Sequence, residues 1–175
     1  MPDLPPRQMF EKAREFAGRN DWEKAVVWYR RAADAGITDA MLVLAAHHAV
    51  RDELPTAQDW LRQYLAVGYR DRELLAGYLR GAIAAQFMSR PHDARRWEMR
   101  VRTSPGFPGA ADPLHVRRTA VAVVFALLVE GIDPPGGPKA GGGSTAASGG
   151  CLLAVLAAGF LPALFAVLLV TRTAV

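Results

Sequence analysis

The stretch that decides the fold, residues 20–45, reads NDWEKAVVWYRRAADAGITDAMLVLA. Its apolar positions follow offsets of 0, 3, 4, 7 and 8, which places them on one stripe of an α-helix: Ala25, Trp28, Tyr29, Ala32 and Ala33. Gly36 ends this helix, because glycine readily adopts the left-handed conformation that a helix end needs. Asp39 and Ala40 begin the next helix. The stretch therefore predicts two helices joined by a tight turn.

The same pattern repeats 32 residues further along the chain. Nine positions carry the same or a like residue at this offset: Met9 and Met41, Ala13 and Ala45, Ala17 and Ala49, Asp21 and Glu53, Ala25 and Ala57, Trp28 and Trp60, Arg30 and Arg62, Gly36 and Gly68, and Asp39 and Asp71. Small side chains let the two helices of a hairpin approach closely, and each tryptophan can bury ~150–250 Å² between successive hairpins. A period of this length is typical of stacked helical units that cannot cover their own apolar faces.

The first unit resembles a Sel-one-like repeat, the short subclass of the tetratricopeptide helical repeats. The resemblance is carried by Ala25-x-x-Trp28-Tyr29-Arg30-Arg31-Ala32-Ala33-x-x-Gly36, followed by Ala40 and Leu44-Ala45. A second unit keeps Ala57, Trp60, Arg62 and Gly68, and a degenerate third unit keeps Asp71, Leu75, Ala94 and Trp97. The resemblance covers residues 6–102. It implies a short α-solenoid of about three helix-turn-helix repeats, a fold that generally binds other proteins or peptides.

The expected fold is all-α. The repeat domain, residues 1–102, is predicted to contain helices over 6–18, 22–35, 38–50, 56–67, 72–88 and 92–102, several of which follow a capping residue or a proline. Residues 103–132 form a breaker loop and a seventh helix, which begins at Asp112-Pro113 and runs to about residue 130. Its uncharged part, residues 119–129, would span ~17 Å, which is short of a ~30 Å bilayer core. This helix either caps the open end of the solenoid or forms the first limb of a membrane hairpin.

The C-terminal part of the chain predicts a membrane anchor. Residues 133–150, DPPGGPKAGGGSTAASGG, have the composition of a flexible linker. Residues 151–170 are twenty consecutive apolar residues, CLLAVLAAGFLPALFAVLLV, and as a helix they would span ~30 Å. We expect a transmembrane helix over 151–171, a short tail over 172–175, and a cytoplasmic N-terminal domain by the positive-inside rule. The small-residue ladder Gly150, Ala154 and Ala158 would permit self-association in lipid.

Charge and chemistry exclude several classes of function. The formal net charge is +4, and seven arginines against three acids lie in residues 90–118, a weak basic excess that suits an anionic membrane surface better than nucleic acid. Cys151 is the only cysteine, so no intrachain disulfide is possible. Adjacent helical residues point ~100° apart, so His47 and His48 cannot chelate one metal ion unaided. No catalytic arrangement of residues and no cofactor motif stands out, and the sequence does not predict an enzyme.

The candidate partner-binding residues lie on the second helices of the first two units: Trp28, Tyr29, Arg30, Arg31, Trp60 and Arg62. We expect them on the concave surface, where arginines could grip a carboxylate, although both tryptophans could serve only the packing. The predicted function is a membrane-anchored scaffold or adaptor for a protein or peptide partner. The alternative is a two-helix integral subunit of a membrane complex that uses the repeats for assembly.

Overall fold

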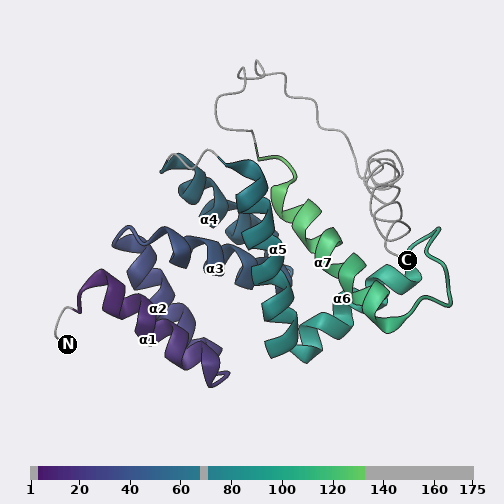
Figure 1. Ribbon diagram of the computed structural model, residues 1–175, viewed down its shortest axis with the longest axis horizontal. Coiled ribbons are helices and arrows are strands. Elements are labelled where there is room, and N and C mark those ends of the chain that lie inside the picture. The colour runs from purple at the N-terminus through teal and green to yellow at the C-terminus, as the bar shows by residue number, and fades with distance from the viewer. Residues whose placement is uncertain (1–3, 68–70, 133–175) are drawn as a thin grey trace, which may run out of the picture. The chain divides into compact units, whose positions relative to one another are not determined.

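Seven α-helices account for the regular structure of residues 4–67 and 71–132, the residues that this computed structural model describes, and no strand occurs among them (Figure 1). The helices are α1 (Pro6–Gly18), α2 (Trp22–Asp34), α3 (Thr38–Val50), α4 (Leu54–Ala66), α5 (Arg72–Ser89), α6 (Pro91–Thr103) and α7 (Pro113–Val129). The predicted all-α fold is confirmed, and each helix begins and ends within two residues of its predicted bounds.

The turns inside the first two units repeat in backbone detail. Asn20 follows α1 with a φ of 60°, and Asp52, 32 residues later, follows α3 with a φ of 69°. Asparagine and aspartate tolerate this left-handed conformation better than most residues. In both turns the N–H of this residue donates to the carbonyl three residues back, at 2.9 and 3.0 Å, and the next N–H donates to the carbonyl five residues back, at 2.9 Å. Gly36 (φ 88°) makes the same two hydrogen bonds between α2 and α3.

The first two predicted units are helical hairpins. The helix α1 packs along α2, and α3 packs along α4. Five of the six alanines that recur at the 32-residue offset have no solvent exposure: Ala13, Ala25, Ala45, Ala49 and Ala57. The helix α3 is central, because it contacts α2, α4, α5 and α7, and ten of its thirteen residues are buried. A helix that is apolar on every side is suited to this position.

The third unit departs from the hairpin pattern. Only Arg90 separates α5 from α6, and Pro91 is the first residue of α6. Antiparallel helices that lie side by side need a connection of about two to five residues. The helix α5 instead packs mainly against α3, and α6 packs mainly against α7. The indole Nε1 of the buried Trp97 donates to the carbonyl oxygen of Val50 at 2.8 Å, which joins α6 to the end of α3.

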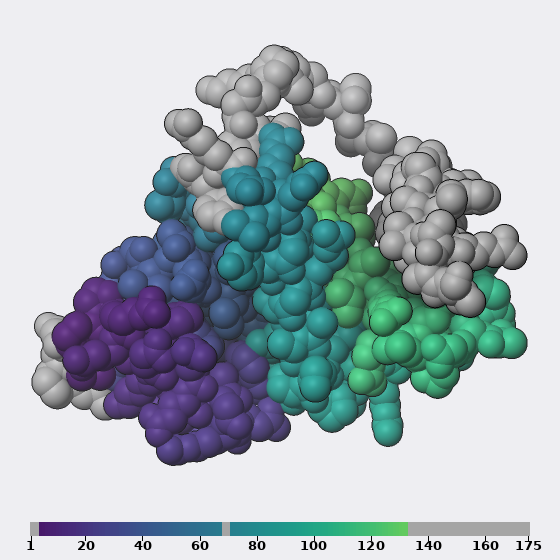
Figure 2. All heavy atoms as spheres, in the orientation of Figure 1, coloured from purple at the N-terminus to yellow at the C-terminus, as the bar shows by residue number. Residues whose placement is uncertain are grey.

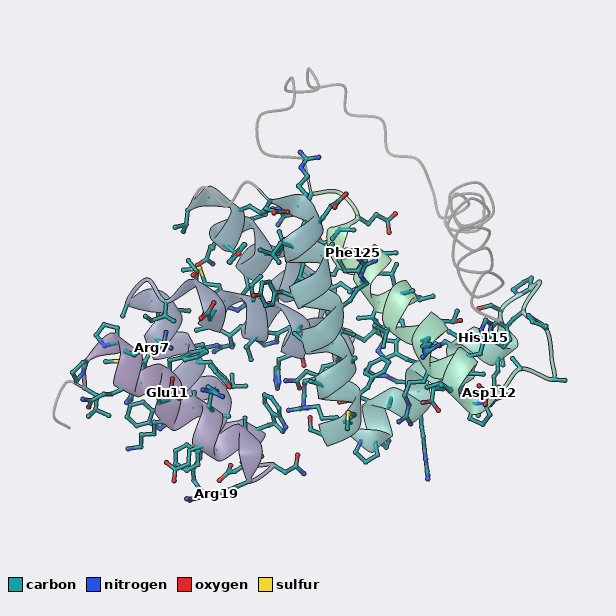
Figure 3. The ribbon with its side chains drawn as sticks, in the orientation of Figure 1. Arg7, Glu11, Arg19, Asp112, His115 and Phe125 are labelled. Carbon is teal, nitrogen blue, oxygen red and sulfur yellow. The ribbon has the colours of Figure 1, made fainter. Side chains whose placement is uncertain are left out.

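The helix α7 packs against α3, α4, α5 and α6. Asp112 caps the start of α7, as the sequence predicts. Its carboxylate accepts a hydrogen bond from the backbone N–H of His115 at 3.3 Å (Figure 3). One stripe of α7 has no solvent exposure: Val116, Ala120, Val124 and Leu128. Outside this stripe, the Arg80 guanidinium of α5 lies 5.2 Å from the ring centre of Phe125.

None of the described helices is both long enough and apolar enough to cross a membrane. The predicted linker (133–150), transmembrane helix (151–171) and tail (172–175) lie outside the described residues.

Candidate functional site

A groove of about 570 Å³ runs across the first helices of the three units. It lies between α1, α3 and α5, with one residue from α4, and atoms of α1, α3 and α5 are neighbours on the face that Figure 2 shows. Its lining consists of Arg7, Phe10, Arg14, Thr38, Asp39, Leu42, Val43, Tyr64, Leu74, Tyr78 and Ala82. We call it the A-helix groove.

The floor of the A-helix groove is buried and apolar, whereas one wall is apolar and exposed. Phe10 and Leu42 are buried at the floor. On α5, Leu74, Tyr78 and Ala82 follow each other at intervals of four residues, so they form one stripe along the groove. Leu74 is 48% exposed and Tyr78 is 61% exposed. The stripe that α5 buries in the core lies one residue further along the chain, at Leu75, Leu79 and Ile83. The helix therefore presents apolar side chains in two directions.

Arginines from α1 give the opposite wall of the groove its charge. The carboxylate of Glu11 lies 3.6 Å from Arg7 Nε and 3.0 Å from Arg14 Nη1, so one carboxylate forms ion pairs with two arginines (Figure 3). All three side chains are well exposed, and such pairs contribute little to stability. Asp39 adds one negative charge on α3. The groove can therefore accept a ligand that combines apolar side chains with an acidic group facing α1.

The six residues that the sequence nominated lie elsewhere, and none of them lines the A-helix groove. Tyr29 is buried, its ring packs edge-on against Phe10 at 5.7 Å, and this burial raises its pKa to about 12. Trp28 is partly buried, with Lys12 Nζ 4.3 Å and the Arg31 guanidinium 4.8 Å from its ring centre.

The remaining nominated residues belong to α2 and α4. Arg30 is exposed and Trp60 is partly buried. Arg62 is exposed and pairs with Asp59 at 2.7 Å. Both helices pack against α3. A partner contact at any of the six residues stays a prediction, but the structure does not bring them together in the groove. Tyr29 in particular offers no ring surface to a partner, because only 4% of the residue is exposed.

The sequence contained a signal for the groove that the search for recurring residues passed over. The recurring tryptophans and arginines lie on second helices, whereas the groove is built from first helices. At the 32-residue offset Leu74 falls on Leu42, which lines the same groove, whereas Tyr78 falls on Ala46 and is not selected by the repeat. The signal was the second apolar stripe of α5. A helix that packs into a solenoid through one face needs only one apolar stripe.

Among the described residues, no three histidine, cysteine or acidic side chains are grouped so that they could hold a metal ion. Comparison of the chain with protein-family models, with curated proteins and with solved structures finds no match.

Proposed function

We propose that this protein is an adaptor, held at a membrane by its C-terminal apolar segment, that binds a protein or peptide partner in the A-helix groove. The observation that carries this proposal is the exposure of Leu74 and Tyr78 above a buried apolar floor. Single exposed apolar side chains are common on ordinary protein surfaces, whereas several that gather at a hollow mark an interaction surface.

The groove favours a partner segment with one apolar side and an acidic residue. Its apolar side chains would cover Leu74 and Tyr78, and its acid would meet the α1 wall, where Glu11 is shared by Arg7 and Arg14. A peptide bound in this way gains affinity from the buried apolar contacts, and the exposed charges set its direction. The proposed role is binding, without a chemical step.

The membrane part of the proposal rests on sequence. Residues 151–170 contain no charged or polar side chain apart from the thiol of Cys151, and the preceding residues 133–150 have a linker composition. A tether of this kind confines the helical domain to the membrane and raises its concentration near membrane partners. The helical domain would then face the cytoplasm.

The groove is tested by proximity labelling with the full chain in cells. The double variant Leu74→Ser, Tyr78→Ser removes the exposed apolar wall and leaves the buried stripe of α5 intact. The control Val27→Ser, Met99→Ser changes two side chains of matched exposure, 49% and 62%, that lie outside the groove. We expect the groove variant to lose specific partners about tenfold, the effect of removing one or two central contacts. Equal loss in both variants, or in neither, contradicts the proposal.

The anchor is tested by protease protection in sealed vesicles. In the proposed topology, cutting the linker from the cytoplasmic side releases an intact helical domain. A linker protected on that side would instead favour the two-helix integral subunit. The packing of α7 weighs against that alternative, because Arg117 of α7 donates to Glu98 of α6 at 2.7 Å and Gln58 of α4 donates to two carbonyl groups at the end of α7.

A further inference from the structure

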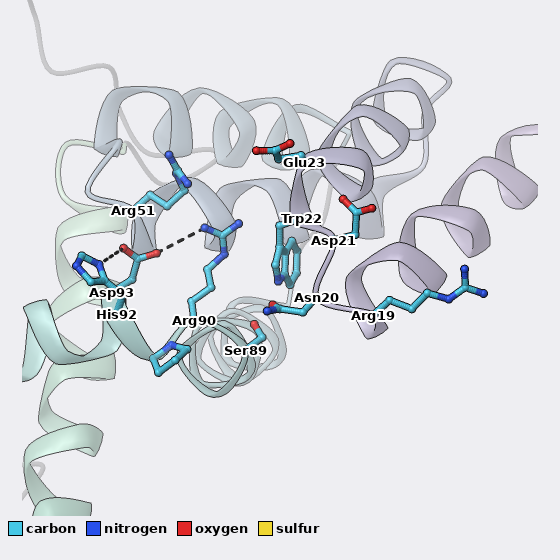
Figure 4. A pocket seen from close by; sticks show the side chains of 11 residues that line it. Arg19, Asn20, Asp21, Trp22, Glu23, Arg51, Ser89, Arg90, His92 and Asp93 are labelled. Atoms are coloured by element: carbon cyan, nitrogen blue, oxygen red, sulfur yellow. Dashed lines mark ion pairs between the residues drawn. The ribbon is translucent and has the colours of Figure 1, made fainter.

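A second hollow lies where the end of α3 meets the start of α2 and the corner between α5 and α6. Two adjoining spaces of about 350 and 730 Å³ share Trp22, Glu23, Arg51 and Arg90 in their linings. Figure 4 shows the Arg90 guanidinium next to the Trp22 ring, below Arg51. We call this hollow the Arg90 cleft. Its lining residues differ from those of the A-helix groove, so a ligand could bind here whether or not a partner binds in the groove.

Several polar atoms in the Arg90 cleft are buried without a hydrogen-bond partner among the described residues. They are the indole Nε1 of Trp22, Nδ1 of His47, Nε2 of His48 and Nε of Arg90. Both histidines are 5% exposed, and both line the smaller space. Buried polar groups are normally paired, because an unpaired one costs about 1–3 kcal/mol. Such a concentration of unpaired groups at one hollow points to a bound group that pairs them.

The charge of Arg90 is incompletely balanced. Its side chain is 13% exposed, and its nearest carboxylate, Asp93, lies 3.5 Å from Nη1. Asp93 also serves Arg96 at 3.7 Å, so it is divided between two arginines. Burial and the nearby Arg51 lower the pKa of Arg90. The second carboxylate at this corner, Glu53, accepts from Arg51 at 2.8 Å and from His48 at 2.6 Å, and its charge only partly offsets that of Arg90.

Two of the unpaired atoms, the indole nitrogen and the guanidinium Nε, have a hydrogen-bonding role that does not depend on protonation, and both are donors. An indole N–H and a guanidinium Nε–H can only donate. Asp93 contacts Arg90 at Nη1, and Arg90 Nε is buried with no hydrogen-bond partner among the described residues. The Nε edge of the guanidinium matches the two oxygens of a carboxylate, which arginine binds in a forked geometry. The Trp22 ring lies 5.2 Å from the guanidinium and holds it in place from one side.

The start of α6 also lies at the cleft. Arg90 is the residue that precedes this helix, and no side chain caps it. Pro91 has no N–H, so the first backbone donors of α6 belong to His92 and Asp93, and N–H groups at a helix start favour an anion. Four acids at the cleft oppose a large negative charge: Asp21 pairs with Lys24, Glu53 pairs with Arg51 and His48, Asp93 lies by Arg90, and Glu23 is exposed. A singly charged group fits these surroundings better than a doubly charged phosphate.

We propose that the Arg90 cleft is a carboxylate-binding site, in which the Nε edge of Arg90 and the indole N–H of Trp22 donate to the ligand. The carboxylate could belong to a small organic acid or to the C-terminus of a peptide. The two sources share this chemistry, and their relative affinities separate them.

The experiment uses the full chain in detergent micelles and follows the indole N–H signals by ¹H–¹⁵N correlation NMR. The chain has four tryptophans, and Trp22→Phe identifies the signal of Trp22. The probes are acetate, a short peptide with a free C-terminus, the same peptide amidated, and inorganic phosphate. We expect acetate and the free peptide to shift the Trp22 signal, and the other two probes to shift it far less. A free peptide that binds about tenfold tighter than acetate identifies a chain terminus as the ligand, and equal affinities identify a small acid.

Arg90→Gln should weaken carboxylate binding at least about tenfold, because it removes a charged, forked hydrogen bond. The control Arg95→Gln removes an exposed arginine of α6 that does not line the cleft, and it should bind as the unaltered chain does. If Arg90→Gln does not fold, Arg90→Lys keeps the charge without the fork and should show the same weakening. Three results would overturn the proposal: no Trp22 shift with any carboxylate, phosphate binding as tight as acetate, or unchanged binding in the folded Arg90 variant.

Discussion

His47 should make the protein less stable as the pH falls from 7 to 5. Burial, followed by the positive charges of Arg90 and its neighbours, lowers the pKa of His47 from 6.5 to about 3. Over this range the unfolded chain takes up a proton on His47, whereas the folded chain does not. The unfolded state then binds more protons, so acid shifts the equilibrium towards it. With these two pKa values the free energy of unfolding falls by about 2 kcal/mol between pH 7 and pH 5.

The assay is urea unfolding followed by far-UV circular dichroism at several pH values between 5 and 7. His47→Leu and His47→Asn both lack the titrating ring, although they pack differently. Both should lose the same part of the pH dependence, about 2 kcal/mol between pH 7 and pH 5, whatever their stability at pH 7. Burial raises the pKa of Glu53, but hydrogen bonds from Arg51 and His48 outweigh it and lower this pKa from 4.5, away from the pH range of the assay. If both variants keep the pH dependence of the unaltered chain, the reasoning about His47 is refuted.

Three further predictions concern the fold. Trp97→Phe keeps an aromatic ring but removes the N–H that donates to Val50, and it should lower the free energy of unfolding by about 1–2 kcal/mol; an unchanged urea midpoint contradicts this. Gly36→Ala should destabilise by about 1 kcal/mol because φ is +88°, whereas Gly81→Ala, inside α5 and with open space around it, should stabilise by a similar amount. Equal signs for these two variants would refute the role given to the turn. Gln58→Ala should speed amide exchange at the end of α7, whose carbonyl groups it binds, and unaltered exchange there would show that this contact does not hold the helix.

Helix positions could be predicted from the sequence because they depend on local patterns. The apolar stripe of residues 25–33 and the glycine after it act over one or two helical turns, and the structure has α2 and its end where they indicate. The repeat offset added a second, independent constraint on α3 and α4. The left-handed turn residues Asn20 and Asp52 are a further pair of like residues at the same offset, and the left-handed conformation that they share does not follow from the spacing alone.

The direction of α6 could not be predicted in this way. The degenerate match at Ala94 and Trp97 correctly indicated a buried face, since both residues are buried. The partner of that face depends on how the chain turns at Arg90, and a residue pattern with helical spacing contains no information about that direction. The buried indole of Trp97 donates a hydrogen bond to the end of α3, whereas the repeat pattern would pair its helix with α5.

The Arg90 cleft escaped prediction because its parts are distant in sequence. Trp22, His47 and Arg90 are separated by 25 and 43 residues, and only the stacking of α2, α3 and α5 brings them to one hollow. The adjacent pair His47 and His48 drew attention as a possible metal site, but the His47 ring lies 5.3 Å from the Trp22 indole, and His48 Nδ1 pairs with Glu53 at 2.6 Å. Chemistry of this kind depends on contacts between elements, which spacing within one helix does not describe.

The cleft forms where the second unit departs from the first, and one substitution shows the physical reason. Asp21 caps α2 by accepting from the backbone N–H of Lys24. Its equivalent, Glu53, has a longer side chain and makes no such cap on α4. Its carboxylate reaches back to accept from Nδ1 of His48 at 2.6 Å and from Arg51 at 2.8 Å. His48 in turn occupies the position of Phe16, an aromatic residue of the first unit. An apolar contact and a helix cap in one unit are thus replaced by a partly buried polar pair in the next. This replacement engages Glu53 with His48 and Arg51, so the carboxylate that pairs with Arg90 is Asp93, which Arg90 shares with Arg96.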